Sequence, residues 1–297
     1  SLLVALLAEH GGSDLLTFSV GFEDHPHERG HEFEFFDQVV ERYATRHHKI
    51  HVPNHEVLDR LPEAIDHMAE PMVGQDAVAF YLLAEQVSKK IKVVQSGQGA
   101  DEVFGGYFWY PQMQQARGID LERFAPFYFD RDHDEYLAMV SEQYGGPDYT
   151  AALVEDRLAA VNSDQYLNRV LHLDVTTLVV DDPVKRVDNM TMAWGLEARV
   201  PFLDRDLIAF GMRLPPAWKL RSADRPEKLL LRLAFEDLAQ AWKPVMPIEF
   251  EYVNMEVNPH FANIVSPTEV VVVNTCWQLG FPSLSLLVIW ALGASML

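Results

Sequence analysis

Strand and helix signals alternate through the first hundred residues, and this alternation limits the fold more than any other feature of the chain. Apolar and β-branched runs predict strands at Leu15–Val20, His48–Val52 and Ile91–Gln95. Helical periodicity predicts helices at Glu32–His47, His55–Ala69 and Ala77–Lys90. Strands separated by helices favour an open, largely parallel sheet that is covered on both faces. The predicted fold class is therefore α/β.

The second part of the chain carries a different pattern. From about Tyr107 the strand signals fade, and helices are predicted at Asp148–Val161, Asp164–Val180 and Asp224–Ala239. We therefore expect an α/β part over residues 1–106, a mainly helical part over 107–239 and a divergent apolar tail over 240–297. The opening run, Ser1–Glu9, lacks the basic leader of a signal peptide and is expected to be a helix.

Composition excludes some classes of function and compartment. The formal net charge is −20 and no basic stripe is present, so nucleic acid is not an expected partner. The single cysteine, Cys276, suits a reducing compartment, and we expect the cytoplasm. Residues 270–297 carry no charge, but their uninterrupted apolar run is shorter than the roughly 20 residues that span a bilayer. A membrane anchor is disfavoured, although a membrane-tethered interaction protein stays open as an alternative.

A glycine-rich stretch with two adjacent acids, "SGQGADEVFGGY" (Ser96–Tyr107), directly follows the third predicted strand. Gly97 and Gly99 would let backbone N–H groups approach a phosphate, and Asp101 could hold Mg²⁺ against the same phosphate. The alternative is a glycine turn with an acidic helix N-terminus, which is common in proteins. The spacing alone favours neither.

A second stretch, "DDPVKRVDNMTMAWGLEARVPFLD" (Asp181–Asp204), places charges among large apolar residues. The charged side chains are Lys185, Arg186, Asp188, Glu197 and Arg199. Charges in such a setting are usually paired and buried, or they point into a site. A structural network of ion pairs and direct contact with a substrate are both open readings.

Together the two stretches resemble the synthetase domain of the asparagine synthetase family, glutamine-dependent amidotransferases that use ATP. The first is similar to the family's "SGEGADEVFGGY", and "RVDNMTMAWGLEARVPFLD" is similar to its helical signature on the substrate side. "TFSVGFED" and "RHHKIHV" are similar to the adenine-side strand and the strand after it. The likeness runs to about Leu238, and its details are closest to the N-acetylglutaminylglutamine amidotransferases. It implies an adenine nucleotide α-hydrolase (PP-loop ATP pyrophosphatase) sheet followed by a mainly helical region.

The resemblance also implies a reaction. A substrate carboxylate would attack the α-phosphate of ATP to give an acyl-adenylate and pyrophosphate, and ammonia from a glutaminase domain would then displace AMP. The implied cofactors are ATP and Mg²⁺, and the implied substrate is a small carboxylate or a short peptide. Assembly as a homodimer is left open.

The resemblance assigns roles to individual residues. The implied nucleotide contacts are Ser1, Val20, Gly21, Ser96 and Gly97, and the implied metal ligand is Asp101. The implied catalytic and acceptor-pocket residues are Gln98, Asp188, Glu197 and Arg199.

Four departures from the family pattern are expected to matter. Ser1 stands as the last residue of the family's "SGGxDSS" pyrophosphate loop, and Gln98 stands where many relatives carry glutamate. Glutamine cannot act as a base near neutral pH, so proton removal from ammonia would fall elsewhere. The glutaminase domain is absent and Cys276 cannot replace its nucleophile, while Lys243 is a poor substitute for the family's clamping lysine. We therefore expect a fragment, and a catalytically inactive remnant is the main alternative.

Histidines in the stretch "DHPHERGHEF" suggest a second metal site, at His25, His27 and His31. Zinc needs converging ligands of defined geometry, and this stretch has the character of a solvated loop, so a zinc site is disfavoured. The aromatic run Tyr107–Pro111 is expected to pack in the core rather than to stack on bases.

Overall fold

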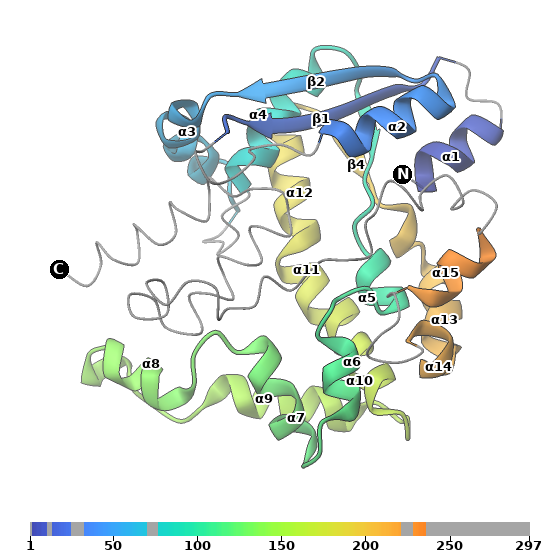
Figure 1. Cartoon of the computed structure of the whole chain (residues 1–297). Helices are drawn as coiled ribbons and strands as arrows, with labels where there is room; N and C mark the ends of the chain where they lie inside the picture. The colour runs from blue at the N-terminus through green and yellow to red at the C-terminus, as the bar shows by residue number, and fades with distance from the viewer. Residues whose placement is uncertain (1, 11–13, 25–32, 70–76, 221–227, 236–297) are drawn as a thin grey trace. The chain divides into compact units, whose positions relative to one another are not determined.

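The computed structural model describes residues 2–10, 14–24, 33–69, 77–220 and 228–235 (Figure 1). These residues form two compact units, which are described separately. Among the described residues, the first unit contains those up to Ser96 and then Asp182–Arg199. The second contains Gly97–Asp181 and Val200–Phe235. The chain therefore leaves the first unit within the glycine-rich stretch.

The first unit combines short strands with helices. Its elements are α1 (Leu2–Glu9), β1 (Leu16–Phe22), α2 (Phe33–Tyr43), β2 (Arg46–Val52), α3 (Asn54–Asp66), α4 (Ala77–Ser88), β3 (Val93–Gln95), α12 (Pro183–Met192) and β4 (Glu197–Arg199). Each strand and helix predicted for the first hundred residues is present, and most bounds differ by only a few residues.

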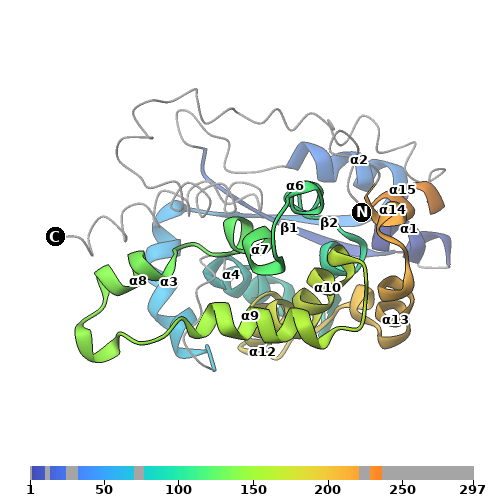
Figure 2. The ribbon, with the colours of Figure 1, turned by 90° about the horizontal axis from the view of Figure 1, so that it is seen from below.

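Strands β1 and β2 are parallel, as predicted, with Leu16 opposite Arg46 and Phe22 opposite Val52. The two views agree that α2 lies against one face of this pair and α4 against the other (Figure 2). Phe22 and Val52 are buried in a core that also takes in residues of α3, α4 and α12. The expected covering of the strands on both faces is therefore confirmed for this pair.

The third predicted strand does not join this pair among the described residues. Instead β3 pairs in parallel with β4, so that Val93 lies opposite Glu197 and Gln95 opposite Arg199. The expectation of one open sheet needs this correction for the described part of the chain. Sequence periodicity missed β4 because only three residues form it and two of them are charged. Leu196, directly before β4, is buried against Ala84 and Val87 of α4.

The second unit is helical, as predicted for the region after Tyr107. Its elements are α5 (Ala100–Phe104), α6 (Tyr110–Gln115), α7 (Asp120–Tyr128), α8 (His133–Met139), η1 (Glu142–Tyr144), α9 (Tyr149–Ala160), α10 (Tyr166–Leu173), η2 (Asp174–Leu178), α11 (Val179–Asp181), η3 (Pro201–Leu203), α13 (Arg205–Arg213), α14 (Pro216–Lys219) and α15 (Leu229–Ala234). The predicted helix Asp164–Val180 is α10, η2 and α11 in succession, and η2 is a single π-helical turn.

The core of the second unit is aromatic and aliphatic. Tyr110, Met113 and Phe124 are buried against α9 and α10, and Tyr107 and Trp109 pack on the same cluster. The prediction that the aromatic run Tyr107–Pro111 packs in the core is confirmed. The lysine Lys219 is also fully buried, and it donates a hydrogen bond to Asn168 Oδ1.

Several predictions lie outside the described residues. They concern Ser1, the histidines His25, His27 and His31, and the tail 240–297 with Lys243 and Cys276. Only α15 is described within the predicted helix Asp224–Ala239. None of the helices in the described part of the chain has the length and hydropathy that a membrane crossing requires.

Candidate functional site

The glycine-rich stretch turns sharply into α5. Gly99 precedes this helix with a φ of 91°, and a Cβ atom on it would lie 2.3 Å from the Leu203 side chain. Both the backbone conformation and the close packing require glycine at this position. Gly97 differs, because no heavy atom of the described residues lies within 4 Å of the place that its Cβ would occupy. The described residues therefore give no packing reason for glycine at Gly97, and they leave space beside its backbone.

Asp101 and Lys228 form an ion pair beside α5. The distance from Lys228 Nζ to Asp101 Oδ1 is 2.6 Å, and both side chains are about one-third exposed. Gly106 lies directly behind them: a Cβ atom there would be 2.0 Å from Asp101 Oδ1 and 2.5 Å from Lys228 Cε. The pair therefore depends on glycine at this position.

The two adjacent acids of the stretch have different environments. Glu102 is buried, and its Oε1 accepts a hydrogen bond from the Tyr107 hydroxyl at 2.5 Å. Burial raises the pKa of Glu102, and burial together with the nearby Glu102 charge raises the pKa of Tyr107 well above its usual range. Asp101 is therefore the acid that can reach a ligand, and Glu102 holds the turn from inside.

Three of the residues that the resemblance singles out lie at β3 and β4 of the first unit: Ser96 directly follows β3, and Glu197 and Arg199 belong to β4. The Ser96 backbone N–H donates to the Arg199 carbonyl at 2.8 Å. Arg199 Nε donates to Glu197 Oε1 at 2.9 Å, and these two side chains are about 60% exposed. They lie two residues apart on a strand and so share one face of it. The structure therefore places the Ser96 backbone beside β4, which carries the Glu197–Arg199 pair.

The rest of the charged stretch has other surroundings. Arg186 is buried, and its Nη1 donates to Asp182 Oδ1 at 2.7 Å within α12, which is a structural ion pair. Asp188 is exposed on the same helix. The structural reading is therefore confirmed for Arg186, whereas contact of the exposed Glu197–Arg199 pair with a substrate stays a prediction.

The implied adenine contacts lie near the carboxyl end of β1. Val20 is opposite Ile50 and Gly21 is opposite His51 in the parallel pair, and Gly21 is buried. Ligands of open α/β sheets bind at the carboxyl ends of strands, which is where this segment stands. Gln98 and Gly97 belong to the second unit, on the turn that leads into α5.

Sequence reasoning missed Lys228, Gly106 and the partner of Glu102. Lys228 stands directly before α15 and has a φ of 55°, which is unusual for a residue with a side chain. In the sequence it is one charge at the start of an amphipathic helix, so nothing distinguishes it from a solvated lysine. The two glycines of "FGGY" indicate that another group packs closely against the backbone there. They do not indicate that this group is the Asp101–Lys228 pair.

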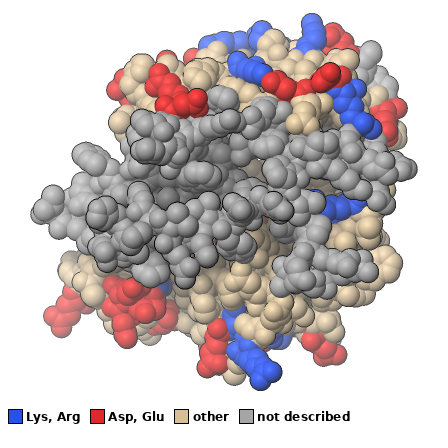
Figure 3. Space-filling view, viewed as in Figure 1, with Lys and Arg blue, Asp and Glu red and all other residues tan. Residues whose placement is uncertain are grey.

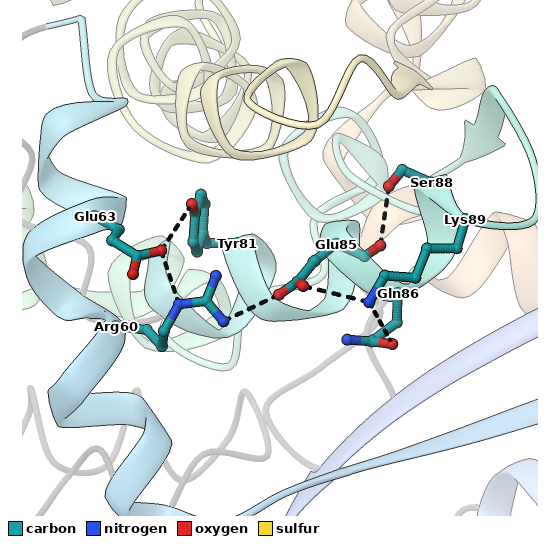
Figure 4. Close-up of polar contacts among 7 residues, drawn as sticks. All are labelled: Arg60, Glu63, Tyr81, Glu85, Gln86, Ser88 and Lys89. Atoms are coloured by element: carbon teal, nitrogen blue, oxygen red, sulfur yellow. Dashed lines mark hydrogen bonds and ion pairs between the residues drawn. The ribbon is translucent and has the colours of Figure 1, made fainter.

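A separate polar cavity lies in the first unit among β2, α3 and α4. Its volume is about 630 Å³, and its lining includes Lys49, Arg60 and Glu85. Arg60 donates to Glu63 Oε2 at 2.8 Å and to Glu85 Oε2 at 3.1 Å, which joins α3 to α4 (Figure 4). Arg60, Glu63 and Glu85 satisfy one another's hydrogen-bonding groups, so we interpret the three as a structural link between α3 and α4.

The described surface carries charges of both signs. On the face drawn in Figure 3, acidic and basic side chains alternate over the visible described atoms rather than gathering into a basic stripe. The described residues also contain no group of three or more His, Cys, Asp or Glu side chains that could hold a metal ion together. A metal at Asp101 would therefore need oxygen ligands from a bound substrate or water.

Comparison with known families decides what kind of protein this is. The family model described as asparagine synthase matches residues 1–241, which is most of the chain. The chain belongs to the asparagine synthase family. The resemblance in the two sequence stretches is thereby confirmed. A second family model, flagellar motor switch protein FliM, matches residues 227–279, of which the structure describes 228–235.

Curated relatives carry the same family name. A protein of Mycobacterium tuberculosis whose name describes a glutamine-hydrolysing asparagine synthetase is 29% identical over 277 residues, covering 81% of this chain and 41% of the relative. Asparagine synthetase 2 of Oryza sativa is 28% identical over 245 residues, with coverages of 81% and 32%. Asparagine synthetase 3 of Bacillus subtilis is 26% identical over 265 residues, with coverages of 80% and 41%. The chain thus spans 32–41% of the length of these relatives.

Proposed function

We propose that this chain is the synthetase part of an ATP-dependent amidotransferase, which adenylates a carboxylate and transfers the acyl group to ammonia. The observation that carries the proposal is the Asp101–Lys228 pair at the start of α5, held by Gly106 in a member of the asparagine synthase family. An acid and an amine side by side next to a glycine turn suit a magnesium-bound polyphosphate.

The nucleotide would lie along the glycine turn. The open space beside Gly97 supports a close approach of phosphate to the backbone, and Ser96 adds a hydroxyl at the end of β3. Val20 and Gly21 would contact the adenine, since they stand near the carboxyl end of β1. Ser1 is proposed for the same site on the family pattern alone.

Magnesium fits the residues that are present. Mg²⁺ commonly binds one or two carboxylates together with phosphate oxygens and water, and Asp101 offers one partly exposed carboxylate. When bound, the ion would neutralise charge on the phosphates. Lys228 must give up part of its contact with Asp101 for the carboxylate to turn to the ion, and its amine is then free for a phosphate oxygen.

The acceptor carboxylate would lie beside β4. Arg199 would supply a positive charge to pair with the substrate carboxylate. Glu197 would orient the Arg199 guanidinium through the 2.9 Å hydrogen bond that it accepts from Arg199 Nε. In the first step a carboxylate oxygen forms a bond to the α-phosphorus, and the bond from that phosphorus to the pyrophosphate oxygen breaks. In the second step ammonia attacks the carbonyl carbon, AMP leaves, and one proton is lost.

The proton lost from the attacking ammonia needs a base. Gln98 can accept a hydrogen bond but cannot take up a proton near neutral pH. Glu197, which is exposed and ionisable, is the better base, and the exposed Asp188 on α12 is proposed for the acceptor pocket on the family pattern alone. The proposed substrates are a small carboxylate or a short peptide, as in the N-acetylglutaminylglutamine branch, and the ammonia would come from a glutaminase domain.

Isotope exchange between ATP and pyrophosphate tests the adenylation step directly. The chain is incubated with Mg-ATP, labelled pyrophosphate and a panel of small carboxylates and dipeptides, without ammonia, so that the acyl-adenylate can return to ATP. Exchange that depends on one carboxylate and is lost in Arg199→Met is the expected result. Exchange that needs no carboxylate, or an Arg199→Met variant with full exchange, contradicts the proposed role. No exchange with any member of the panel supports the inactive alternative.

A further inference from the structure

The second unit contains a carboxylic acid that the proposed reaction does not use. Asp174 is fully buried, and its Oδ2 accepts hydrogen bonds from the hydroxyls of Tyr110 and Tyr128, each at 2.6 Å. Its other oxygen, Oδ1, is also buried and has no hydrogen-bond partner in the described structure. A buried acid with one oxygen left unpaired costs free energy, so its presence calls for a physical reason.

The place of Asp174 in its helix is unusual as well. It is the first residue of η2, the π-helical turn between α10 and α11. Such turns widen a helix by one residue and redirect a side chain, and they occur often at functional sites. Here the redirected carboxylate meets Tyr110 on α6 and Tyr128 on α7, so one side chain ties together three helical segments of the unit.

A continuous set of contacts leads from Asp174 to Asp101, the acid that we propose as a magnesium ligand. The ring of Tyr110 lies 5.5 Å from the ring of Tyr107, and the Tyr107 hydroxyl donates to Glu102 at 2.5 Å. Glu102 is next to Asp101 on α5, and α5 packs directly against η2. Packed rings and hydrogen bonds therefore connect Asp174 to α5 without a break.

We propose that Asp174 is a positioning residue for Asp101, which it holds beside Lys228 through the tyrosines and α5. The proposal rests on the proposed function, because it assumes that Asp101 serves a magnesium-bound nucleotide. Asp174 itself touches neither nucleotide nor substrate. It fixes the position of α5, the helix that carries Asp101.

The charge of Asp174 gives this role a measurable signature. Burial raises the pKa of Asp174 to about 7, against the lowering effect of the two tyrosine hydrogen bonds. The groups that face it are Tyr110 from α6, Tyr128 from α7 and the buried Glu102 from α5, which is a second acid. Ionisation therefore places two negative charges in one core, and their repulsion loosens α5.

Two readouts at pH 6 and pH 8.5 test the proposal on the whole chain. Hydrogen exchange of the α5 amides follows the position of the helix, and calorimetry follows Mg-ATP affinity. In the unmodified chain both the protection of α5 and the affinity fall by about threefold or more at the higher pH. Asp174→Asn keeps a hydrogen-bond acceptor but cannot ionise, so it removes the part of the pH dependence that comes from Asp174, and both quantities change less with pH than in the unmodified chain. Asp156→Asn, an exposed change on α9, behaves as the unmodified chain.

The result that overturns the proposal is a pH dependence that is as large in Asp174→Asn as in the unmodified chain, or none in the unmodified chain. If Asp174→Asn fails to fold, Tyr128→Phe takes its place. It removes one hydrogen bond that favours the ionised acid, so the midpoint of the exchange curve moves to higher pH, and an unmoved midpoint also overturns the proposal. If Mg-ATP does not bind at any pH, the proposed function fails, while hydrogen exchange still decides whether Asp174 positions α5.

Discussion

Lys228 Nζ lies 2.6 Å from Asp101 Oδ1, so an amine already neutralises the carboxylate that we propose for magnesium. The arrangement couples metal and nucleotide. A free divalent ion competes with Lys228 for the carboxylate, whereas an ion that arrives with phosphates offers the displaced amine a new partner. We therefore expect the chain to bind Mg-ATP more tightly than it binds Mg²⁺ alone or ATP alone.

Replacement of Lys228 separates these two effects. Lys228→Met removes the competing charge, so the affinity for Mn²⁺ alone, used as a spectroscopic probe of the magnesium site, rises by about threefold. Affinity for Mg-ATP falls in the same variant because a positive charge near the phosphates is lost. Lys89→Met, which removes an exposed amine of the first unit, changes neither quantity. A Lys228→Met variant that binds Mn²⁺ more weakly contradicts this account of the pair.

Two glycines of the α5 stretch predict opposite patterns of stability and affinity. Gly106→Ala places a methyl group 2.0 Å from Asp101 Oδ1, so it separates the ion pair and lowers stability by about 1 kcal/mol or more. The added methyl group of Gly97→Ala has no heavy atom of the described part of the chain within 4 Å, so we expect stability to stay nearly unchanged. If phosphate approaches the backbone there, it still weakens Mg-ATP binding. Denaturant unfolding and calorimetry on both variants provide the check, and full affinity in Gly97→Ala argues against a phosphate at that turn.

Asp174 also predicts how the stability of the chain depends on pH. Its folded pKa of about 7 lies above the ordinary aspartate value of 3.8, so between these two pH values the folded chain holds a proton that the unfolded chain has released. This contribution to stability is complete below pH 4 and is lost as the pH rises to about 7. In Asp174→Asn the loss disappears, which is worth up to about 4 kcal/mol at pH 8. Urea unfolding of both proteins at pH 5 and pH 8 measures the difference, and equal pH dependence would be the contrary result.

The link between α3 and α4 provides a test of the first unit. Arg60 and Glu85 are both mostly buried, whereas Glu63 is half exposed, so the Arg60–Glu85 pair should couple more strongly than the Arg60–Glu63 pair. Double-mutant cycles with Arg60→Met, Glu85→Gln and Glu63→Gln measure both couplings. We expect about 1 kcal/mol for the first pair and less for the second. A larger coupling to Glu63 would contradict this assignment.

Periodicity predicted the helices and strands of the first hundred residues because each is long enough to show its repeat. It failed at β4, where three residues carry no repeat and the pairing with β3 links positions about a hundred residues apart in the chain. A pattern within a short window cannot report that separation. The second unit illustrates the same limit, since the π turn at Asp174 lies inside a helix that periodicity predicted as continuous.

The sequence predicts those parts of the candidate site whose residues are neighbours in the chain. The glycine turn and Asp101 were predicted because glycines and acids adjoin, but the sequence gives no reason why Asp101 and Glu102 should have different surroundings. Packing decides that difference: one faces Lys228 and the other faces Tyr107. Lys228 itself was not predicted, because only the fold brings it from a distant segment to α5.

Calorimetric titration of the purified chain with Mg-ATP tests the central claim most directly. Asp101→Ala and Asp156→Asn are measured beside the unmodified chain, with circular dichroism to show that each is folded. We predict binding by the unmodified chain and by Asp156→Asn, and a loss of about tenfold or more in Asp101→Ala. Equal binding by all three, or no binding by a folded unmodified chain, would contradict the assignment of this site to a magnesium-bound nucleotide.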